Sequence, residues 1–261
     1  MSGEITINGL THVFRRGKGQ DPLLALQNID LEIPAGRFVS LVGLSGCGKS
    51  TLLKTIAGLI TPSAGEILLD GAPVVGPGVE RGMVFQQDAV FPWLSVLDNI
   101  AFGLRAKGVS AAESTEQAAF WAERVGLKGF ETAMPKELSG GMRKRVDIAR
   151  VYANGPTVLL MDEPFGALDA QTKESMQDDL IELWEQDRRT VVFVTHDLDE
   201  ALVLSDEVVV MAPRPGRIQQ VEHIGIERPR SAETRLSPEF LAAKRDLHQR
   251  LNTHQKVDHN A

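Results

Sequence analysis

A run of nine residues, 43–51, constrains this chain more than any other feature. It reads Gly-Leu-Ser-Gly-Cys-Gly-Lys-Ser-Thr and fits the pattern G-x-x-x-x-G-K-[ST]. In that pattern, backbone N–H groups cradle phosphates, the lysine reaches the β and γ phosphates, and the serine hydroxyl holds Mg²⁺. We therefore expect a protein that binds a nucleoside triphosphate. The predicted ligands of the nucleotide in this run are Gly43, Ser45, Gly46, Cys47, Gly48, Lys49, Ser50 and Thr51.

Composition limits where such a protein works. The formal net charge of −7 disfavours broad nucleic-acid binding, because sequence-independent affinity for nucleic acids comes from Lys and Arg. Cys47 is the single cysteine, so an internal disulfide is impossible and a reduced cytoplasm is the simpler compartment. The first residues lack the pattern of a signal peptide, and the apolar runs are far shorter than the ~20 residues that cross a bilayer. We expect no nucleic-acid partner and only a peripheral membrane role.

Six apolar, β-rich runs alternate with helical patterns along the chain. Short, almost wholly apolar strands separated by helices indicate a parallel sheet covered on both faces. We therefore expect an α/β architecture with all six runs in its sheet. The runs are residues 37–42, 66–69, 82–85, 157–161, 190–195 and 207–211.

Helical patterns fill the intervals between these runs. After the phosphate loop, apolar residues recur with the period of one buried helical face as far as Leu59 and Ile60. Residues 171–188 show the same period. Residue 214 begins a stretch rich in proline and charge, in which one helix is expected to start at Ser237 and Pro238.

Strand signals disappear between residues 88 and 152, where three segments read as helix. We interpret this region as a helical lobe inserted into the α/β core. The predicted domains are an ATP-binding core formed by residues 1–87 and 153–225, a helical subdomain of residues 88–152, and a C-terminal tail of residues 226–261.

Two strand ends carry side chains suited to phosphoryl transfer. Asp162 and Glu163 follow the buried run, where Asp162 would reach Mg²⁺ and Glu163 would polarise the attacking water. Strands that end in solvated acids are common, but the preceding phosphate loop favours the catalytic interpretation. His196 follows another apolar strand and would sense or stabilise the γ-phosphate. Alone, a histidine at a strand end is more often structural or merely exposed.

These residues resemble the ATP-binding subunits of ABC transporters, and the resemblance covers residues 5 to 224. It implies a P-loop NTPase (RecA-like) α/β core with an inserted α-helical subdomain and an N-terminal antiparallel β region. The matching features are Leu138-Ser139-Gly140-Gly141 for the signature sequence, Gln86 for the Q-loop, Ala167-Leu168-Asp169 for the D-loop, His196 for the switch histidine, and Phe14 for an aromatic that stacks on adenine.

The resemblance also implies how the motifs act. In this family the signature sequence faces the ATP of a partner subunit, so two copies would close head to tail on two ATP molecules, and hydrolysis would release them. Gln86 would connect the site to the helical lobe and the membrane partner. The residues implied for ATP binding across the dimer are Ser139, Gly140, Gly141 and Asp169. The implied catalytic residues are Lys49, Gln86, Glu163 and His196, and the implied Mg²⁺ ligands are Ser50, Gln86 and Asp162.

One position departs from the family pattern. The commonest family residue after Gly141 is Gln, and this chain has Met142. The basic run Arg143-Lys144-Arg145 follows, on a helix expected to bury Val146. We interpret this run as a solvated, positively charged face.

Large apolar groups beside the Q-loop suggest a docking surface. Residues 88–94 include Phe91 and Trp93 in an expected loop, and exposed aromatics there are typical of partner contacts. We predict that they contact a permease subunit, although burial in the core of the lobe explains Trp93 equally well.

Residues 76–82, 91–94 and 215–218 are similar to the branch of the family that imports nitrate, taurine or aliphatic sulfonates. The resemblance implies the ATPase subunit of a bacterial importer for a small oxyanion or sulfonate, peripheral on the cytoplasmic face of the cell membrane. Its implied cofactors are ATP and Mg²⁺, and its implied partners are a second ATP-binding subunit, permease subunits and, indirectly, a solute-binding protein. A soluble ABC-type ATPase and a phosphate-loop kinase are the alternatives.

Overall fold

The computed structural model describes residues 2–15, 17, 19–231 and 233–253. The chain divides into two compact units: unit 1 comprises Met1–Gly78 and Arg189–Ala261, and unit 2 comprises Val79–Arg188. The predicted domain boundaries after residues 87, 152 and 225 stay a prediction.

The N-terminal strands of unit 1 form an antiparallel sheet. Strand β1 (Ile5–Phe14) pairs with β2 (Leu23–Ile33) and with β4 (Ala64–Leu69), and β5 (Ala72–Pro73) completes the order β2-β1-β4-β5. The expected place of residues 66–69 in the parallel sheet is therefore wrong. A short apolar run looks alike in either kind of sheet, and the partner strand decides which one it joins.

A second sheet of unit 1 carries the phosphate loop. Strand β3 (Phe38–Gly43) lies between two parallel neighbours, β8 (Thr190–Val194) and β9 (Glu207–Ala212), and every residue of β3 and β8 is buried. Strand β10 (Arg217–His223) pairs antiparallel with β9. No strand is predicted at β10, because the polar residues Gln219, Gln220 and Glu222 interrupt its two apolar positions.

Helix α1 (Lys49–Ile56) starts inside the phosphate loop and is shorter than its sequence pattern predicts. A Cβ on Gly58 would lie 2.1 Å from the Gly76 carbonyl oxygen, and Gly58 adopts a left-handed φ of +75°. The chain therefore turns there, and Leu59, expected on the buried face, is 49% exposed.

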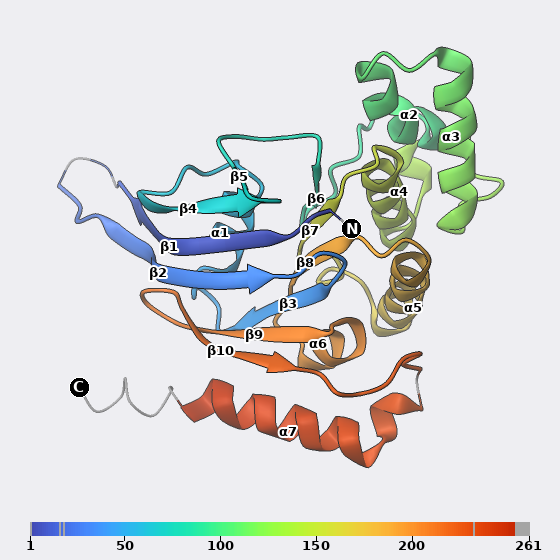
Figure 1. The fold of residues 1–261 in the computed structure, drawn as a ribbon. Helices are drawn as coiled ribbons and strands as arrows, with labels where there is room; N and C mark the ends of the chain where they lie inside the picture. Colours follow the sequence, from blue (N-terminus) through green and yellow to red (C-terminus); the bar gives the residue numbers. More distant parts are fainter. Residues whose placement is uncertain (1, 16, 18, 232, 254–261) are drawn as a thin grey trace. The chain divides into compact units, whose positions relative to one another are not determined.

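Three further helical segments belong to unit 1. They are α6 (Leu198–Leu204), the short 3₁₀ segment η2 (Thr234–Leu236) and α7 (Pro238–Thr253). Helix α7 starts where Ser237 and Pro238 predict, and it runs beside β10 (Figure 1). Among the described residues, no helix has the length and apolar character needed to cross a membrane.

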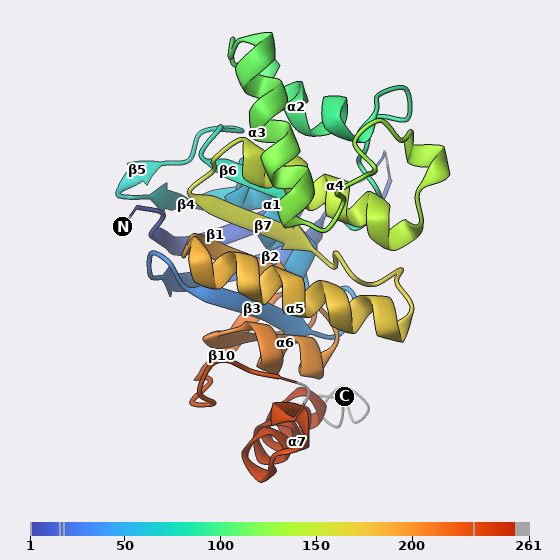
Figure 2. The same ribbon diagram turned by 90° about the vertical axis from the view of Figure 1, so that its right-hand side faces the viewer.

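Unit 2 combines a pair of parallel strands with a group of helices. Side-chain oxygens cap each α-helix of the unit at its N-terminus, as Ser and Asp do at such positions. Helices α2, α3 and α4 lie together in Figure 2. The elements are β6 (Arg81–Val84), β7 (Val158–Asp162), α2 (Val96–Ala106), α3 (Ala111–Arg124), η1 (Pro135–Glu137), α4 (Gly140–Ala153) and α5 (Ala170–Gln186).

Candidate nucleotide site

The phosphate loop joins β3 to α1 in unit 1. Lys49, the first residue of α1, is 6% exposed, and its Nζ donates to the carbonyl oxygens of Gly43 (2.7 Å) and Leu44 (3.3 Å). The ammonium group is therefore held over the loop. Ser50 and Thr51 follow in the first helical turn, where N–H groups and the positive end of the helix dipole favour an anion. The loop thus has the parts needed to bind a polyphosphate.

Glycine is required in this loop for two different reasons. A Cβ on Gly43 would lie 2.7 Å from Cys47 Sγ and 2.7 Å from the Met211 carbonyl oxygen, so the backbone approaches too closely for any side chain. Gly46 has open space around it, but its φ of +81° is left-handed. Cys47 is fully buried beneath this close approach.

His196 lies at the same sheet edge as the phosphate loop. Strands β3 and β8 are parallel, with Leu41 level with Val194, and the Thr195 N–H donates to the Leu41 carbonyl at 3.2 Å. The exposed His196 follows directly. The carboxyl ends of these neighbouring strands therefore bring the loop and His196 together, which is where parallel sheets place their ligands.

Phe14 lies at the end of β1 in the same unit. Its ring is 37% exposed and meets the edge of the His12 ring, with centroids 4.5 Å apart. Strand β2, the partner of β1, passes beside the phosphate loop, because Leu26 Cδ2 would lie 2.7 Å from a Cβ on Gly48. An aromatic face is thus available near the loop, and its stacking on adenine stays a prediction.

Gln86 and Glu163 meet in unit 2. Val84 is level with Met161 in the parallel pair β6–β7, so Gln86 and Glu163 stand equally far beyond the paired ends. Gln86 Nε2 donates to Glu163 Oε2 at 3.4 Å, and Asp162 at the end of β7 is 5% exposed. Glu163 adopts φ +43°, a left-handed conformation that is uncommon for a residue with a side chain. Such conformations cluster at functional sites.

The basic run of α4 is not a solvated face, so that interpretation is wrong. Lys144 is 3% exposed, and its Nζ donates to the carbonyl oxygens of Phe85 (3.0 Å) and Gln86 (3.2 Å). Arg143 Nε pairs with Asp88 Oδ2 at 2.8 Å. The Q-loop segment, which we define as residues 85–89, therefore covers this side of the helix.

Two further residues of α4 bind the same segment. The Ala89 N–H donates to Asp147 Oδ2 (3.0 Å), and the Ala89 carbonyl accepts from Arg150 Nη1 (2.6 Å). Burial raises the pKa of Asp147 and lowers the pKa of Arg150. The Ala89 N–H opposes the shift of Asp147, and the 2.9 Å pair between the two side chains opposes both shifts without cancelling them. We call Arg143, Lys144, Asp147 and Arg150 the Q-loop clamp. Sequence reasoning missed this clamp, although the i,i+3 spacing of Lys144, Asp147 and Arg150 is a signal for it.

The signature and D-loop residues lie at two helix starts in unit 2. Ser139 Oγ accepts the backbone N–H three residues on, which caps α4, and Gly140 and Gly141 form the first turn. A Cβ on Gly141 would lie 2.6 Å from Thr172 Cγ2, so α4 and α5 approach closely there. Asp169 caps α5, and its hydrogen bonds from Thr172 lower the pKa of the Asp169 carboxyl.

An exposed aromatic cluster borders a cavity in unit 2. The Phe91 ring lies 5.5 Å from Trp93 and 4.6 Å from Phe102, with the Arg150 guanidinium 5.1 Å from its centroid. Trp93 is 70% exposed and so does not belong to the core of the lobe. The cavity has a volume of about 490 Å³ and is lined by β6, α2 and α4 residues together with Phe91. Its size is in the range of natural binding pockets.

Known proteins are similar to this chain in sequence. A family model described as "ABC transporter" matches residues 26–166, more than half of the chain. An ATP-binding protein of Brucella abortus (strain 2308) is 51% identical over 90% of this chain and 93% of its own length. The nitrate import ATP-binding protein NrtD of Synechocystis sp. is 48% identical, over 88% of this chain and 85% of that protein. The taurine import ATP-binding protein TauB of Roseobacter denitrificans is 46% identical, over 83% and 80%.

A solved structure confirms the predicted fold class. It is the dimer of an ATP-binding cassette in a post-hydrolysis state bound to ADP and Pi, with a TM-score of 0.75 and 32% identity. The match covers 85% of this chain and 100% of that chain. The resemblance recognised in the motifs is thus confirmed at the level of sequence and of fold. This chain belongs to the ABC transporter family, as an ATP-binding subunit whose hydrolysis of ATP energises transport.

Proposed function

We propose that this chain is the ATPase subunit of an importer for a small oxyanion or sulfonate, peripheral on the cytoplasmic face of the membrane. The observation that carries the proposal is its 46–48% identity to subunits named for taurine and nitrate import, over more than four-fifths of this chain. The loop geometry of unit 1 and the Gln86–Glu163 contact of unit 2 supply the ATPase chemistry that such a subunit needs.

We propose the following roles in hydrolysis. Lys49 and the loop N–H groups neutralise the phosphates. Glu163 accepts a proton from water as the water oxygen bonds to the γ phosphorus and the bond from that phosphorus to the bridging oxygen of ADP breaks. Gln86 orients the Glu163 carboxylate through the 3.4 Å hydrogen bond. His196 donates to the γ-phosphate, where charge develops.

The donor set fits Mg²⁺. The proposed ligands are the Ser50 hydroxyl, the Gln86 amide oxygen and the Asp162 carboxylate, all of which are the oxygen donors that Mg²⁺ prefers. Within the described ranges, no three His, Cys, Asp or Glu residues form a metal-binding group. This agrees with Mg²⁺, which is commonly held by one or two carboxylates together with substrate phosphates. When bound, the ion neutralises charge on the β and γ phosphates.

The signature sequence supports assembly into a dimer of two copies. Ser139 is exposed, and its helix presents Gly140 and Gly141 in the turn where N–H groups lack intrahelical acceptors. We propose that these groups, with Asp169, bind the ATP held by the other copy. The dimeric state of the solved neighbour is consistent with this arrangement.

The aromatic cluster supports contact with a permease subunit. An exposed Trp93 and Phe102 beside a cavity form an apolar surface of the kind that marks protein interfaces. In a Phe91→Ser, Trp93→Ser double variant we expect ATP binding to persist and co-purification with the permease to fail. Phe120→Ser is the matched control, because Phe120 is 52% exposed elsewhere in unit 2. Normal assembly of the folded double variant would remove this surface from the proposal.

Uptake by intact cells tests the whole proposal. A strain lacking this chain is complemented with the wild type or with Glu163→Gln, and uptake of labelled taurine, ethanesulfonate and nitrate is measured. We expect the wild type alone to restore uptake of one of these anions. A chain that hydrolyses ATP, restores none of them and co-purifies with no permease would instead favour the soluble ABC-type ATPase.

A further inference from the structure

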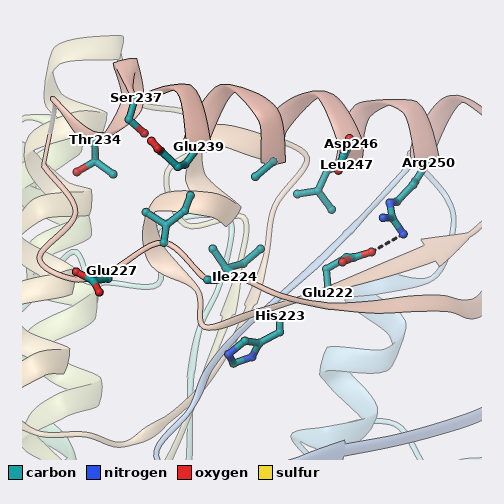
Figure 3. A pocket seen from close by; sticks show the side chains of 13 residues that line it. Glu222, His223, Ile224, Glu227, Thr234, Ser237, Glu239, Asp246, Leu247 and Arg250 are labelled. Carbon is teal, nitrogen blue, oxygen red and sulfur yellow. Dashed lines mark ion pairs between the residues drawn. The ribbon is translucent and has the colours of Figure 1, made fainter.

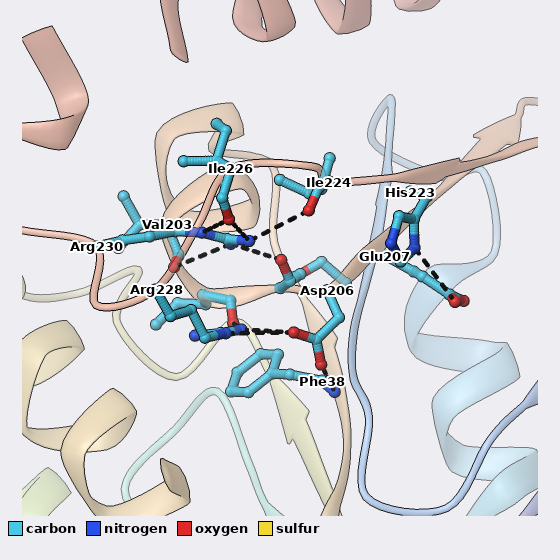
Figure 4. Close-up of polar contacts among 12 residues, drawn as sticks. Phe38, Val203, Asp206, Glu207, His223, Ile224, Ile226, Arg228 and Arg230 are labelled. Carbon is cyan, nitrogen blue, oxygen red and sulfur yellow. Dashed lines mark hydrogen bonds and ion pairs between the residues drawn. The ribbon is translucent and has the colours of Figure 1, made fainter. Parts of the chain in front are cut away.

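The chain beyond β10 binds the C-terminal end of α6. Arg230 is 5% exposed, and its Nη1 donates to the carbonyl oxygens of Leu202 (2.7 Å) and Ser205 (2.6 Å). Its Nη2 donates to the Ile226 carbonyl at 2.8 Å, as Figure 4 shows. The last carbonyls of a helix have no intrahelical donors, and a cation there also complements the helix dipole. Arg230 therefore fixes this end of α6.

A second arginine connects the same segment to the start of β3. Arg228 Nη2 donates to the Leu204 carbonyl (2.6 Å) and pairs with Asp206 Oδ1 (3.0 Å). Asp206 Oδ2 in turn accepts the Phe38 N–H at 3.0 Å (Figure 4). Phe38 is the first residue of the strand that leads into the phosphate loop. Residues 224–230 are thus bonded both to α6 and to the strand beneath the nucleotide loop.

Helix α7 binds the other end of α6. Lys244 Nζ pairs with Asp199 Oδ2 at 2.7 Å, and Asp199 lies in the first turn of α6. The Asp199 N–H donates to Asp197 Oδ1 at 2.8 Å, and Asp197 is the cap that directly follows His196. An ion pair and a hydrogen bond therefore connect α7, through Asp199, to the residue that follows His196.

Helix α7 rests on discrete contacts. A cavity of about 690 Å³ lies between α7 and residues 222–227 (Figure 3). Phe240 and Leu247 are buried, and Arg250 pairs with Glu222 at 2.5 Å. The cavity leaves space beneath part of the helix. A small movement of α7 would therefore be transmitted to α6 by Lys244 and to β10 by Arg250.

We propose that Arg230 and Lys244 are positioning residues for His196. The C-terminal segment holds α6 at both ends and so keeps the switch segment, residues 195–197, in the orientation that hydrolysis requires. The inference rests on the proposed role of His196 in the ATPase reaction. The C-terminal tail would thus affect the rate of ATP hydrolysis, whereas Lys49 and the phosphate loop serve nucleotide binding.

Steady-state ATPase measurements on the full chain test the inference. For Lys244→Met we expect kcat to fall about threefold, the size of effect typical of a half-exposed ion pair, with the KM for ATP unchanged because phosphate binding is untouched. Lys244→Arg keeps the positive charge that pairs with Asp199, so its kcat should equal that of the wild type. Arg250→Met is the matched control, because it removes the ion pair between α7 and β10 and leaves the Lys244–Asp199 pair in place, and it should leave kcat unchanged. Arg230→Met should lower kcat more than Lys244→Met, and Lys244→Met carries the test if Arg230→Met does not fold.

A double variant distinguishes positioning from general loosening. If Lys244 acts through His196, Lys244→Met should lower kcat no further in a His196→Ala background. Wild-type kcat in Lys244→Met, an equal loss in Arg250→Met, or an undiminished loss in the His196→Ala background would each overturn the inference. Wild-type kcat in His196→Ala itself would instead overturn the proposed role of His196, and the inference with it.

Discussion

The phosphate loop and the Q-loop segment are held in place by different means. The phosphate loop is shaped by its own backbone, through the close approach at Gly43, the left-handed Gly46 and the short hydrogen bonds of Lys49. The Q-loop segment is held by charged side chains of α4, which stand 55–61 residues away in the sequence. A loop shaped locally should bind nucleotide independently of its surroundings, whereas a loop held by distant charges is suited to transmit their movements to Glu163.

We expect the largest effect from a substitution of Glu163, which accepts the hydrogen bond from Gln86 of the Q-loop segment. Glu163→Gln should lower ATP turnover by about 10²–10⁴-fold, because the base is lost. ATP binding should persist, so an ATP-bound dimer should accumulate in size-exclusion chromatography. Glu116→Gln, an exposed position on α3, is the control. Full turnover in Glu163→Gln would count decisively against Glu163 as the base.

The next effect tests the phosphate loop. Lys49→Ala should weaken ATP binding by about 10–100-fold, the loss expected for one hydrogen bond to a charged group. Equilibrium binding of a fluorescent ATP analogue measures it. Lys54→Ala, in the last turn of the same helix, should bind normally. Near-normal affinity in Lys49→Ala would overturn the assignment of Lys49 to the phosphates.

Two glycine substitutions separate close approach from backbone conformation. Gly43→Ala should lower the free energy of unfolding by about 1–3 kcal/mol, because its Cβ has no room. Gly46→Ala should cost about 1–2 kcal/mol, from its left-handed φ alone. Chemical denaturation of both variants provides the values. If Gly43→Ala unfolded at the same denaturant concentration as the wild type, the steric account of Gly43 would be wrong.

The smallest effect tests the Q-loop clamp. Lys144→Met should lower ATP turnover about tenfold by displacing the Q-loop segment, while ATP affinity stays within about twofold because the phosphate loop is shaped locally. Lys128→Met removes a 2.5 Å pair to Glu123 at a side chain that is 75% exposed, and it should change neither quantity. Equal losses of affinity and turnover in Lys144→Met would show that the two loops do not act separately.

The same contrast explains what could be predicted from the sequence. The phosphate loop, the strand-end residues Asp162 and His196, and the start of α7 depend on short local patterns, and the structure places the loop and His196 at one sheet edge. The parallel placement of residues 66–69 was wrong because strand pairing is not local. The clamp was missed because a basic run has the same appearance whether water or a buried loop lies against it. Roles across the dimer stay predictions, since they depend on a second chain.

The left-handed backbone of Glu163 sets stability against activity at this position. Glycine adopts φ +43° without the steric cost that a side chain incurs, so Glu163→Gly should relieve about 1 kcal/mol of strain. A thermal melt should show that variant unfolding at a higher temperature than the wild type, although it lacks the proposed base. Selection for stability would favour glycine at this position, whereas selection for ATP hydrolysis would favour glutamate. Only a need for ATP hydrolysis would therefore keep a glutamate there.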